Sequence, residues 1–241
     1  MPHKLFDELW QGDLDESGNP INNVAPAWGD LNSDTPADQS FLEEILDKKA
    51  AGFKVKAYTN SENFVGTNAA VYEVFVERWK NYCDTDPEVQ AFINSQPFHK
   101  GIWNRTTQQY EIVYNVDGSE KYPNRKYMFC YAEYILKDYA LRYGHYFDTW
   151  IFDDAVTMTQ NGDDATGGQI EGQRIYQTYA NAVHAGNPDV PLAFNNGRST
   201  INYAAYPFAV PTYFDDFTFG HAFLGNNDHA EKSSGRFNLN Y

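Results

Sequence analysis

Two adjacent carboxylates, Asp153 and Asp154, directly follow the apolar run Thr-Trp-Ile-Phe at 149–152. That run has the β-branched and aromatic residues that are typical of a buried strand. In parallel α/β proteins, reacting groups lie at the carboxyl ends of strands. We therefore predict that Asp153 is a catalytic carboxylate. The structural alternative is that Asp153 only caps the turn after its strand, because Asp favours turns.

Helices and strands must hold these carboxylates in place. Three parts of the chain show the same succession of predicted elements. In each, an amphipathic helix ends at a glycine and leads into a short apolar strand that closes with polar residues. The helices are predicted at 35–52, 127–143 and 169–185, and the strands at 53–58, 148–153 and 190–194. Right-handed crossovers make such strands parallel, so their polar ends should converge on one rim.

The candidate site residues all lie at or just after a predicted strand. They are Asn60, Glu62, Asp153, Asp154, Asn195, Asn196, Arg198 and, near a last strand expected within 209–219, Asp215, Asp216 and His221. We predict catalytic roles for Asp153, Asp216 and His221, and substrate-binding roles for the other seven. The proton donor is left open among Asp215, Asp216 and His221.

Several of these residues have structural alternatives. Asn195 and Arg198 could donate the hydrogen bonds that keep Asp153 ionised. Arg198 could equally form a salt bridge with Asp153 or Asp154. His221 could be an ordinary loop histidine, and Asp154 could be a cap.

The rest of the chain supplies fewer signals. Residues 1–34 are predicted to be irregular, and further helices are expected at 68–82 and 87–95. A hairpin insertion at about 101–126, with its turn at Asp117-Gly118, would form one wall of a cleft. The glycine- and Asp-rich stretch 157–168 is expected to be a loop.

These elements predict an α/β fold of the (β/α)8 TIM-barrel-like kind, in which 1–241 form a single barrel-type catalytic domain. Only four or five strands can be counted, whereas a closed barrel needs eight. Either further strands lie within 1–34 and 87–126, or the chain is a partial or truncated barrel. An open half-barrel would expose strand edges.

Composition narrows the classes of partner. The net charge of −15 argues against nucleic acid and against an anionic membrane surface. Aromatic residues make up 17% of the chain, which favours a carbohydrate partner because rings stack on sugar C–H faces, although many rings simply fill a core. We expect no cofactor and no metal. The sequence leaves open whether Cys83 and Cys130 form a disulfide. It also leaves the oligomeric state open.

Location follows from the same considerations. The opening residues Met-Pro-His-Lys-Leu-Phe do not have the pattern of a signal peptide. We expect a secreted or periplasmic protein whose leader is absent from this chain.

Three stretches together resemble one family. Residues 139–154, Tyr-Ala-Leu-Arg-Tyr-Gly-His-Tyr-Phe-Asp-Thr-Trp-Ile-Phe-Asp-Asp, are similar to the α-L-fucosidase pattern of a helix ending Arg-Tyr-Gly before a strand ending Trp-Phe-Asp. Residues 51–58, Ala-Gly-Phe-Lys-Val-Lys-Ala-Tyr, resemble that family's preceding strand, and Asn-Asn-Gly-Arg at 195–198 resembles the Asn-Asn-Arg of its next strand. The resemblance covers roughly residues 40–200.

The resemblance implies a TIM-barrel glycoside hydrolase of the α-L-fucosidase and endo-fucanase group. Its substrate would be a polysaccharide that contains fucose, and this class includes sulfated polysaccharides of marine origin. It implies a retaining mechanism in which Asp153 is the nucleophile. Distant fucan-cleaving relatives use His as the acid, which draws attention to His221. The family's N-terminal His-Trp strand is missing here, and Asp154 replaces the small residue that usually follows the nucleophile.

Two rival classes remain. A Mg-dependent phosphohydrolase of the haloacid-dehalogenase-like kind also has an apolar strand ending in Asp, but its second Asp comes two residues later, where this chain has Ala155. The other rival is a non-catalytic carbohydrate-binding remnant of a barrel. A requirement for Mg²⁺ identifies the first, and binding without turnover identifies the second.

Overall fold

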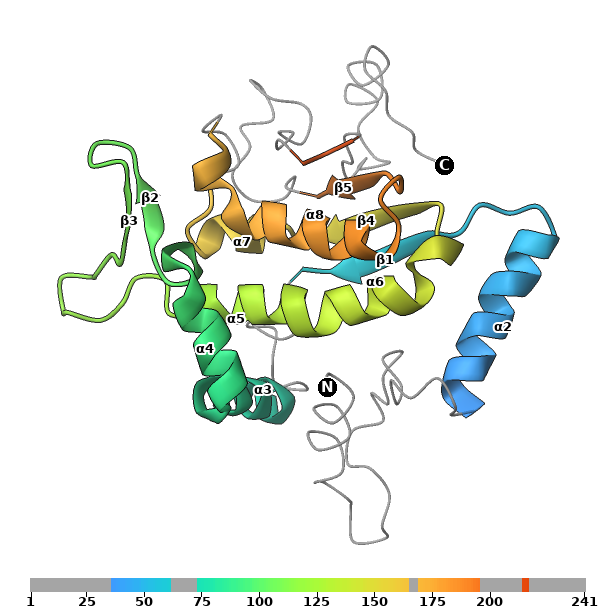
Figure 1. Ribbon diagram of the computed structural model, residues 1–241, viewed down its shortest axis with the longest axis horizontal. Coiled ribbons are helices and arrows are strands. Elements are labelled where there is room, and N and C mark those ends of the chain that lie inside the picture. Colours follow the sequence, from blue (N-terminus) through green and yellow to red (C-terminus); the bar gives the residue numbers. More distant parts are fainter. Residues whose placement is uncertain (1–35, 62–72, 165–168, 196–213, 217–241) are drawn as a thin grey trace, which may run out of the picture.

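The computed structural model describes residues 36–61, 73–164, 169–195 and 214–216, and in these ranges it contains a three-stranded parallel sheet (Figure 1). The strand order is β1 (Lys56–Asn60), β4 (Thr149–Asp153) and β5 (Leu192–Phe194). In register, Asn60 lies opposite Asp153 and Phe152 lies opposite Phe194, so the carboxyl ends meet at one edge. This confirms the predicted α/β architecture with parallel strands.

Among the described residues, one helix precedes β1, and the other helices connect the strands. The helices are α2 (Pro36–Ala50), α3 (Glu73–Thr85), α4 (Pro87–Ser95), α5 (Arg125–Tyr131), α6 (Lys137–Tyr143), α7 (Val156–Gln160) and α8 (Arg174–Gly186). Shorter turns are the 3-10 helices Pro97–His99, Gly144–Tyr146 and Ile170–Gly172, and a π-helical turn, Ala132–Leu136, joins α5 to α6. A separate antiparallel pair is formed by β2 (Ile102–Asn104) and β3 (Gln109–Glu111).

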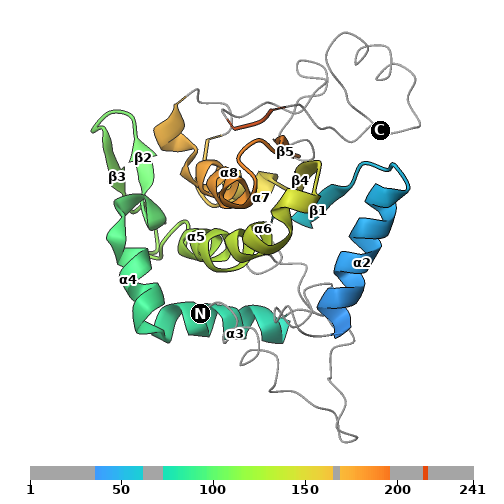
Figure 2. The ribbon, with the colours of Figure 1, turned by 45° about the vertical axis from the view of Figure 1, so that its right-hand side comes forward.

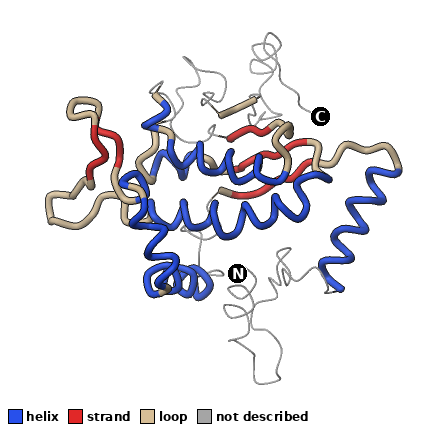
Figure 3. The backbone as a smooth tube through the Cα atoms, in the orientation of Figure 1, coloured by secondary structure: helices blue, strands red, loops and turns tan. Residues whose placement is uncertain are grey.

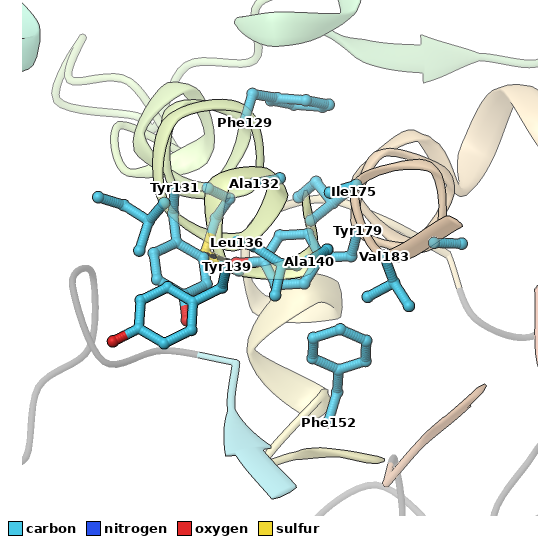
Figure 4. Close-up of a cluster of buried hydrophobic side chains, with 14 of the residues drawn as sticks. Phe129, Tyr131, Ala132, Leu136, Tyr139, Ala140, Phe152, Ile175, Tyr179 and Val183 are labelled. Atoms are coloured by element: carbon cyan, nitrogen blue, oxygen red, sulfur yellow. Dashed lines mark hydrogen bonds between the residues drawn. The ribbon is translucent and has the colours of Figure 1, made fainter. Parts of the chain in front are cut away.

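The long helix formed by α5, the π-turn and α6 lies beside α8, and both run along the sheet (Figure 1). Figure 2 shows α3 on the outer side of α5 and α6, away from the strands. On this side the sheet is therefore covered first by α5 and α6 and then by α3. The core lies between the two long helices and the sheet (Figure 4). There Phe152 stacks on Phe194 at 5.0 Å between ring centroids and meets the edge of Tyr179 at 5.4 Å.

The two faces of the sheet differ. Side chains alternate along a strand, so Asp153 points to the face opposite Phe152. On that face Tyr58, which lies opposite Ile151, is 52% exposed, whereas Phe152 is fully buried. Ile151 and Ala193 on that same face are buried, so the exposed part lies at the ring of Tyr58, beside the end of β4.

Some element boundaries differ from the sequence prediction. The first strand begins at Lys56 rather than at residue 53, and Phe53 is 64% exposed. The expected loop 157–168 begins with α7, which spans Val156–Gln160. In the expected hairpin region, the ladder of β2 and β3 turns at 105–108, and Asp117-Gly118 forms a second turn beneath a single bridge between Tyr114 and Glu120. Figure 3 shows this pair standing apart from the parallel sheet.

The described residues of the expected last strand, 214–216, form a turn and a bend and not a strand. They nevertheless lie along β5, because Asp216 N–H donates to the Leu192 carbonyl at 2.9 Å. The other residues of 209–219 lie outside the described residues.

Asp148 joins the start of β4 to the approach to β1. Its Oδ2 accepts from the Val55 N–H at 2.9 Å and from Lys49 Nζ at 3.0 Å, and its Oδ1 accepts from Lys54 Nζ at 3.1 Å. Burial opposes ionisation of Asp148, but these donors outweigh it and lower its pKa to about 2. The carboxylate thus stabilises the fold only while it is charged.

We expect Asp148→Asn to lower the free energy of unfolding at pH 7 by about 1 kcal/mol, because it removes the charge from a partly exposed cluster. The lowered pKa means that this stabilisation is fully present above the unfolded-state pKa of about 3.9 and is lost as the pH falls toward 2. Urea unfolding between pH 7 and pH 3 should show the two proteins converging below pH 4. A difference in the free energy of unfolding that stays constant across that range would contradict the stabilising role of the Asp148 charge.

The two cysteines are both fully buried and both free thiols. The structure thus describes Cys83 and Cys130 in the reduced form. None of the helices within the described ranges combines the length and the apolar character that crossing a bilayer requires.

Candidate active site

Asp153 ends β4 and is held from both neighbouring strands. The Tyr58 hydroxyl, from β1, donates to Asp153 Oδ2. The side-chain amide of Asn195, the residue after β5, donates to Asp153 Oδ1 at 2.7 Å. Asn195 is 3% exposed, and Asp153 is partly buried. Each carboxylate oxygen therefore has a neutral donor, which favours the ionised form.

The backbone around Asp153 is fixed by the same neighbours. Asn195 N–H donates to the Phe152 carbonyl at 2.8 Å, and Ser61 N–H donates to the Asp153 carbonyl at 2.9 Å. Two tyrosines of α8 secure the chain after the strands: Tyr179 donates to the Ser61 carbonyl at 3.0 Å. Tyr176 donates to the Ala155 carbonyl at 3.1 Å. These contacts hold the rim of the sheet to the helix beneath it.

Asp154 turns the chain out of β4. Its φ is +50°, in the left-handed region that few residues other than glycine adopt. Its carbonyl accepts from the N–H of Thr157 at 3.0 Å and from the Thr157 hydroxyl at 2.7 Å, and α7 begins there. Such strained residues are concentrated at functional sites, at a cost of roughly 1–3 kcal/mol.

Asp215 and Asp216 lie beside β5, and both carboxylates accept backbone N–H groups. Asp215 Oδ1 accepts from Phe194 N–H at 2.6 Å, and Asp216 Oδ2 accepts from Leu192 N–H at 2.9 Å. Leu192 lies opposite Trp150, three residues before Asp153. The structure therefore places the Asp216 carboxylate on the backbone of β5 and does not bring it to Asp153.

The other predicted residues divide into two groups. Asn60 ends β1 in register with Asp153, so the structure places its backbone at the predicted rim. The remaining four, Glu62, Asn196, Arg198 and His221, lie outside the described residues. Their roles stay predictions.

Tyr58 is a site residue that the sequence analysis did not single out. Burial, its hydrogen bond to Asp153 and the negative charges of Asp153 and Asp154 raise the pKa of the Tyr58 hydroxyl, so it stays protonated and can donate. A signal was present in the sequence, since Tyr58 precedes Asn60 by two residues and so points to the same face of β1.

The β2–β3 pair is fixed beside the chain that follows the site. Tyr110 donates to the Glu171 carbonyl at 3.2 Å and accepts from Arg174 Nε at 2.7 Å. Trp103 Nε1 donates to Gln169 Oε1 at 3.2 Å. In Figure 1 the pair stands on the side of the molecule where α7 lies. The pair thus lies against the segment that leads into α8, and its role as a cleft wall stays a prediction.

A buried ion pair fixes the chain between α7 and α8. Arg125 NH1 lies 2.8 Å from Asp163 Oδ1, and both side chains are almost completely buried. Arg125 also donates to the carbonyls of Phe98 and Asn161, at 2.9 Å each. Asp163 Oδ2 accepts the first N–H groups of α8, from Ile175 at 2.7 Å and Tyr176 at 3.2 Å. The chain leaving Asp153 is thus anchored to α8.

Among the residues that the structure describes, no group of three or more His, Cys, Asp or Glu side chains is arranged to hold a metal ion. The chemistry available at the rim is that of a carboxylate between amide and hydroxyl donors.

Solved structures of endo-fucoidan hydrolases are similar to this chain. The endo-fucoidan hydrolase MfFcnA4 of glycoside hydrolase family 107 matches 93% of this chain at 41% identity, with a TM-score of 0.70. A histidine-to-glutamine variant of the same enzyme gives 41% identity and a TM-score of 0.71. MfFcnA9, another endo-fucoidan hydrolase of that family, matches 95% of the chain at 39% identity with a TM-score of 0.72.

This chain resembles part of a family 107 endo-fucoidan hydrolase. The resemblance to the endo-fucanase group that the sequence indicated is thereby confirmed. The chain spans 29% of the length of MfFcnA4 and 36% of the length of MfFcnA9. No family model matches the sequence, and no curated protein matches it.

Proposed function

We propose that this chain is the Asp153-bearing part of a retaining glycoside hydrolase that cleaves fucose-containing polysaccharide, including sulfated fucan. The similarity to endo-fucoidan hydrolases over almost the whole chain supports the substrate class. The observation that carries the chemistry is the Asp153 carboxylate, which lies at the carboxyl end of β4 between the donors Tyr58 and Asn195. We also propose a secreted or periplasmic location, because a long polysaccharide does not cross a membrane unaided.

The proposed reaction has two steps. In the first, an oxygen of Asp153 forms a bond to the anomeric carbon while the glycosidic C–O bond breaks and an acid protonates the leaving oxygen. In the second, water activated by the same acid–base group displaces Asp153. A retaining pair needs carboxyl or equivalent groups about 5–5.5 Å apart.

We propose His221 or Asp215 as the acid–base group of this reaction. Asp215 lies beside Phe194, the residue opposite Phe152, whereas Asp216 lies toward the amino end of β5. Asn60, Glu62, Asp154, Asn195, Asn196 and Arg198 are proposed to bind substrate around Asp153. We further propose that β1, β4 and β5 are part of a barrel of the TIM type, because parallel strands and their covering helices follow its order.

The test is turnover of sulfated fucan by this chain in EDTA, followed by reducing-end release and by gel analysis of the shortened polymer. We expect new reducing ends to form without added metal. Release that requires Mg²⁺, with activity on phosphate esters, would favour a phosphohydrolase. Fucan binding without any release, in a folded protein, would favour the carbohydrate-binding remnant.

A further inference from the structure

We propose that Tyr58 is a positioning residue for Asp153. The phenol of Tyr58 holds Oδ2 of the Asp153 carboxylate in place until substrate arrives. This inference rests on the proposed function, because it concerns how the same carboxylate is prepared for attack. It gives β1 a second residue at the site, beside Asn60, which lies in register with Asp153.

The two donors to Asp153 differ in burial and in how their backbone is bonded. Asn195 is 3% exposed and its backbone is bonded on both sides, since its N–H donates to Phe152 and its carbonyl accepts from Ala155 N–H at 3.0 Å. Tyr58 is 52% exposed, and its hydroxyl lies at the end of a long side chain. The Oδ1 atom is thus held by a buried, rigid amide, whereas Oδ2 is held by a group open to solvent.

This asymmetry distinguishes the two oxygens chemically. When Oδ2 bonds to the anomeric carbon, its negative charge is lost and it becomes the ester oxygen. The Tyr58 hydrogen bond to Oδ2 then weakens, because charge-assisted hydrogen bonds are about twice as strong as neutral ones. Asn195 continues to donate to Oδ1, which becomes the ester carbonyl. We therefore assign Oδ2 as the attacking oxygen and Tyr58 as the group that aims it.

The charges around Tyr58 support a permanent donor. Burial, the hydrogen bond to Asp153 and the negative charges of Asp153 and Asp154 all raise the pKa of its hydroxyl. The two carboxylates make phenolate formation unfavourable, so the proton stays on Tyr58 across the working pH range. A hydrogen bond to the ionised form lowers the pKa of a carboxyl group, so loss of the phenol should raise the pKa of Asp153.

The test compares Tyr58→Phe with the unmodified chain and with Tyr114→Phe, which changes a 58% exposed tyrosine of the 113–121 turn. Phe keeps the ring, so a role in packing alone predicts no change. We expect Tyr58→Phe to lower kcat about tenfold to hundredfold with KM within about twofold, and to move the acid limb of the pH profile upward. Tyr114→Phe should match the unmodified chain.

Unchanged kcat and an unchanged acid limb in Tyr58→Phe, with an active parent, would overturn the positioning role and leave the proposed function standing. If the parent shows no turnover, the proposed function fails, and the contact is tested by carbon-13 NMR titration of the aspartate carboxyls. The result expected is a higher pKa for Asp153 in Tyr58→Phe. Identical titration in both proteins would overturn the inference.

Discussion

Replacing Asp153 by Asn is expected to lower fucan hydrolysis by about three to five orders of magnitude, because an amide cannot attack the anomeric carbon as a carboxylate does. The substitution preserves the shape of the side chain and an oxygen that can accept from Tyr58 or Asn195. The fold should therefore survive, and thermal unfolding within a few degrees of the parent would show that it has. The measurement is initial release of reducing ends at saturating substrate.

The matched control is Asp117→Asn, in a carboxylate of the exposed 115–119 turn that accepts from Ser119 N–H at 2.9 Å. It makes the same chemical change away from the sheet and should leave turnover unchanged. Turnover by Asp153→Asn within about tenfold of the parent would rule Asp153 out as the nucleophile. A similar loss in both variants would point to a charge effect unrelated to the site.

Replacing Gly186 by Ala is expected to lower the free energy of unfolding by about 3 kcal/mol or more, a larger loss than for Asp148→Asn. A Cβ at this last residue of α8 would lie 1.7 Å from the Ala140 carbonyl oxygen and 2.2 Å from its carbonyl carbon. These are backbone atoms of α6, so they cannot rotate aside as a side chain could. The two helices that cover the sheet would have to separate, which would open the core around Tyr179 and Phe152.

Urea unfolding monitored by circular dichroism measures this effect, and Gly118→Ala is the control. Gly118 has φ +84°, a conformation that favours glycine, but a Cβ there would meet nothing within 4 Å. Its replacement should cost only about 1–2 kcal/mol, the ordinary penalty of the left-handed region. Equal losses in the two variants would mean that the contact of α6 with α8 is not tight at Gly186.

The sequence was informative where local chemistry and periodicity agree. The closing glycines predicted the ends of α6 and α8 within one residue, and the apolar run at 149–152 predicted β4 equally closely. The start of α8 lies five residues later than predicted, at Arg174. The crossover rule then predicted the parallel order that brings Asn60, Asp153 and Asn195 to one rim. These inferences succeed because strand direction and side-chain alternation follow from the backbone alone.

Tertiary contacts were less accessible from sequence. Tyr58 looked like a strand residue, and only the register of β1 with β4 shows that its hydroxyl meets Asp153. Asp216 looked like a rim carboxylate, but it accepts the Leu192 N–H that a further strand would otherwise use. The start of β1 also shifted to Lys56, because Asp148 holds Val55 from the side. Each of these depends on a partner 24 to 95 residues away in the chain.

The most direct test of the account is to trap the covalent intermediate. A 2-deoxy-2-fluoro-fucosyl donor with an activated leaving group, or its oligosaccharide analogue, forms an ester that is hydrolysed slowly, and peptide mass spectrometry then locates the sugar. We expect a single adduct on the peptide that contains Asp153, and no adduct in Asp153→Asn. An adduct on another carboxylate, or steady turnover of the donor with no adduct at any time, would contradict it.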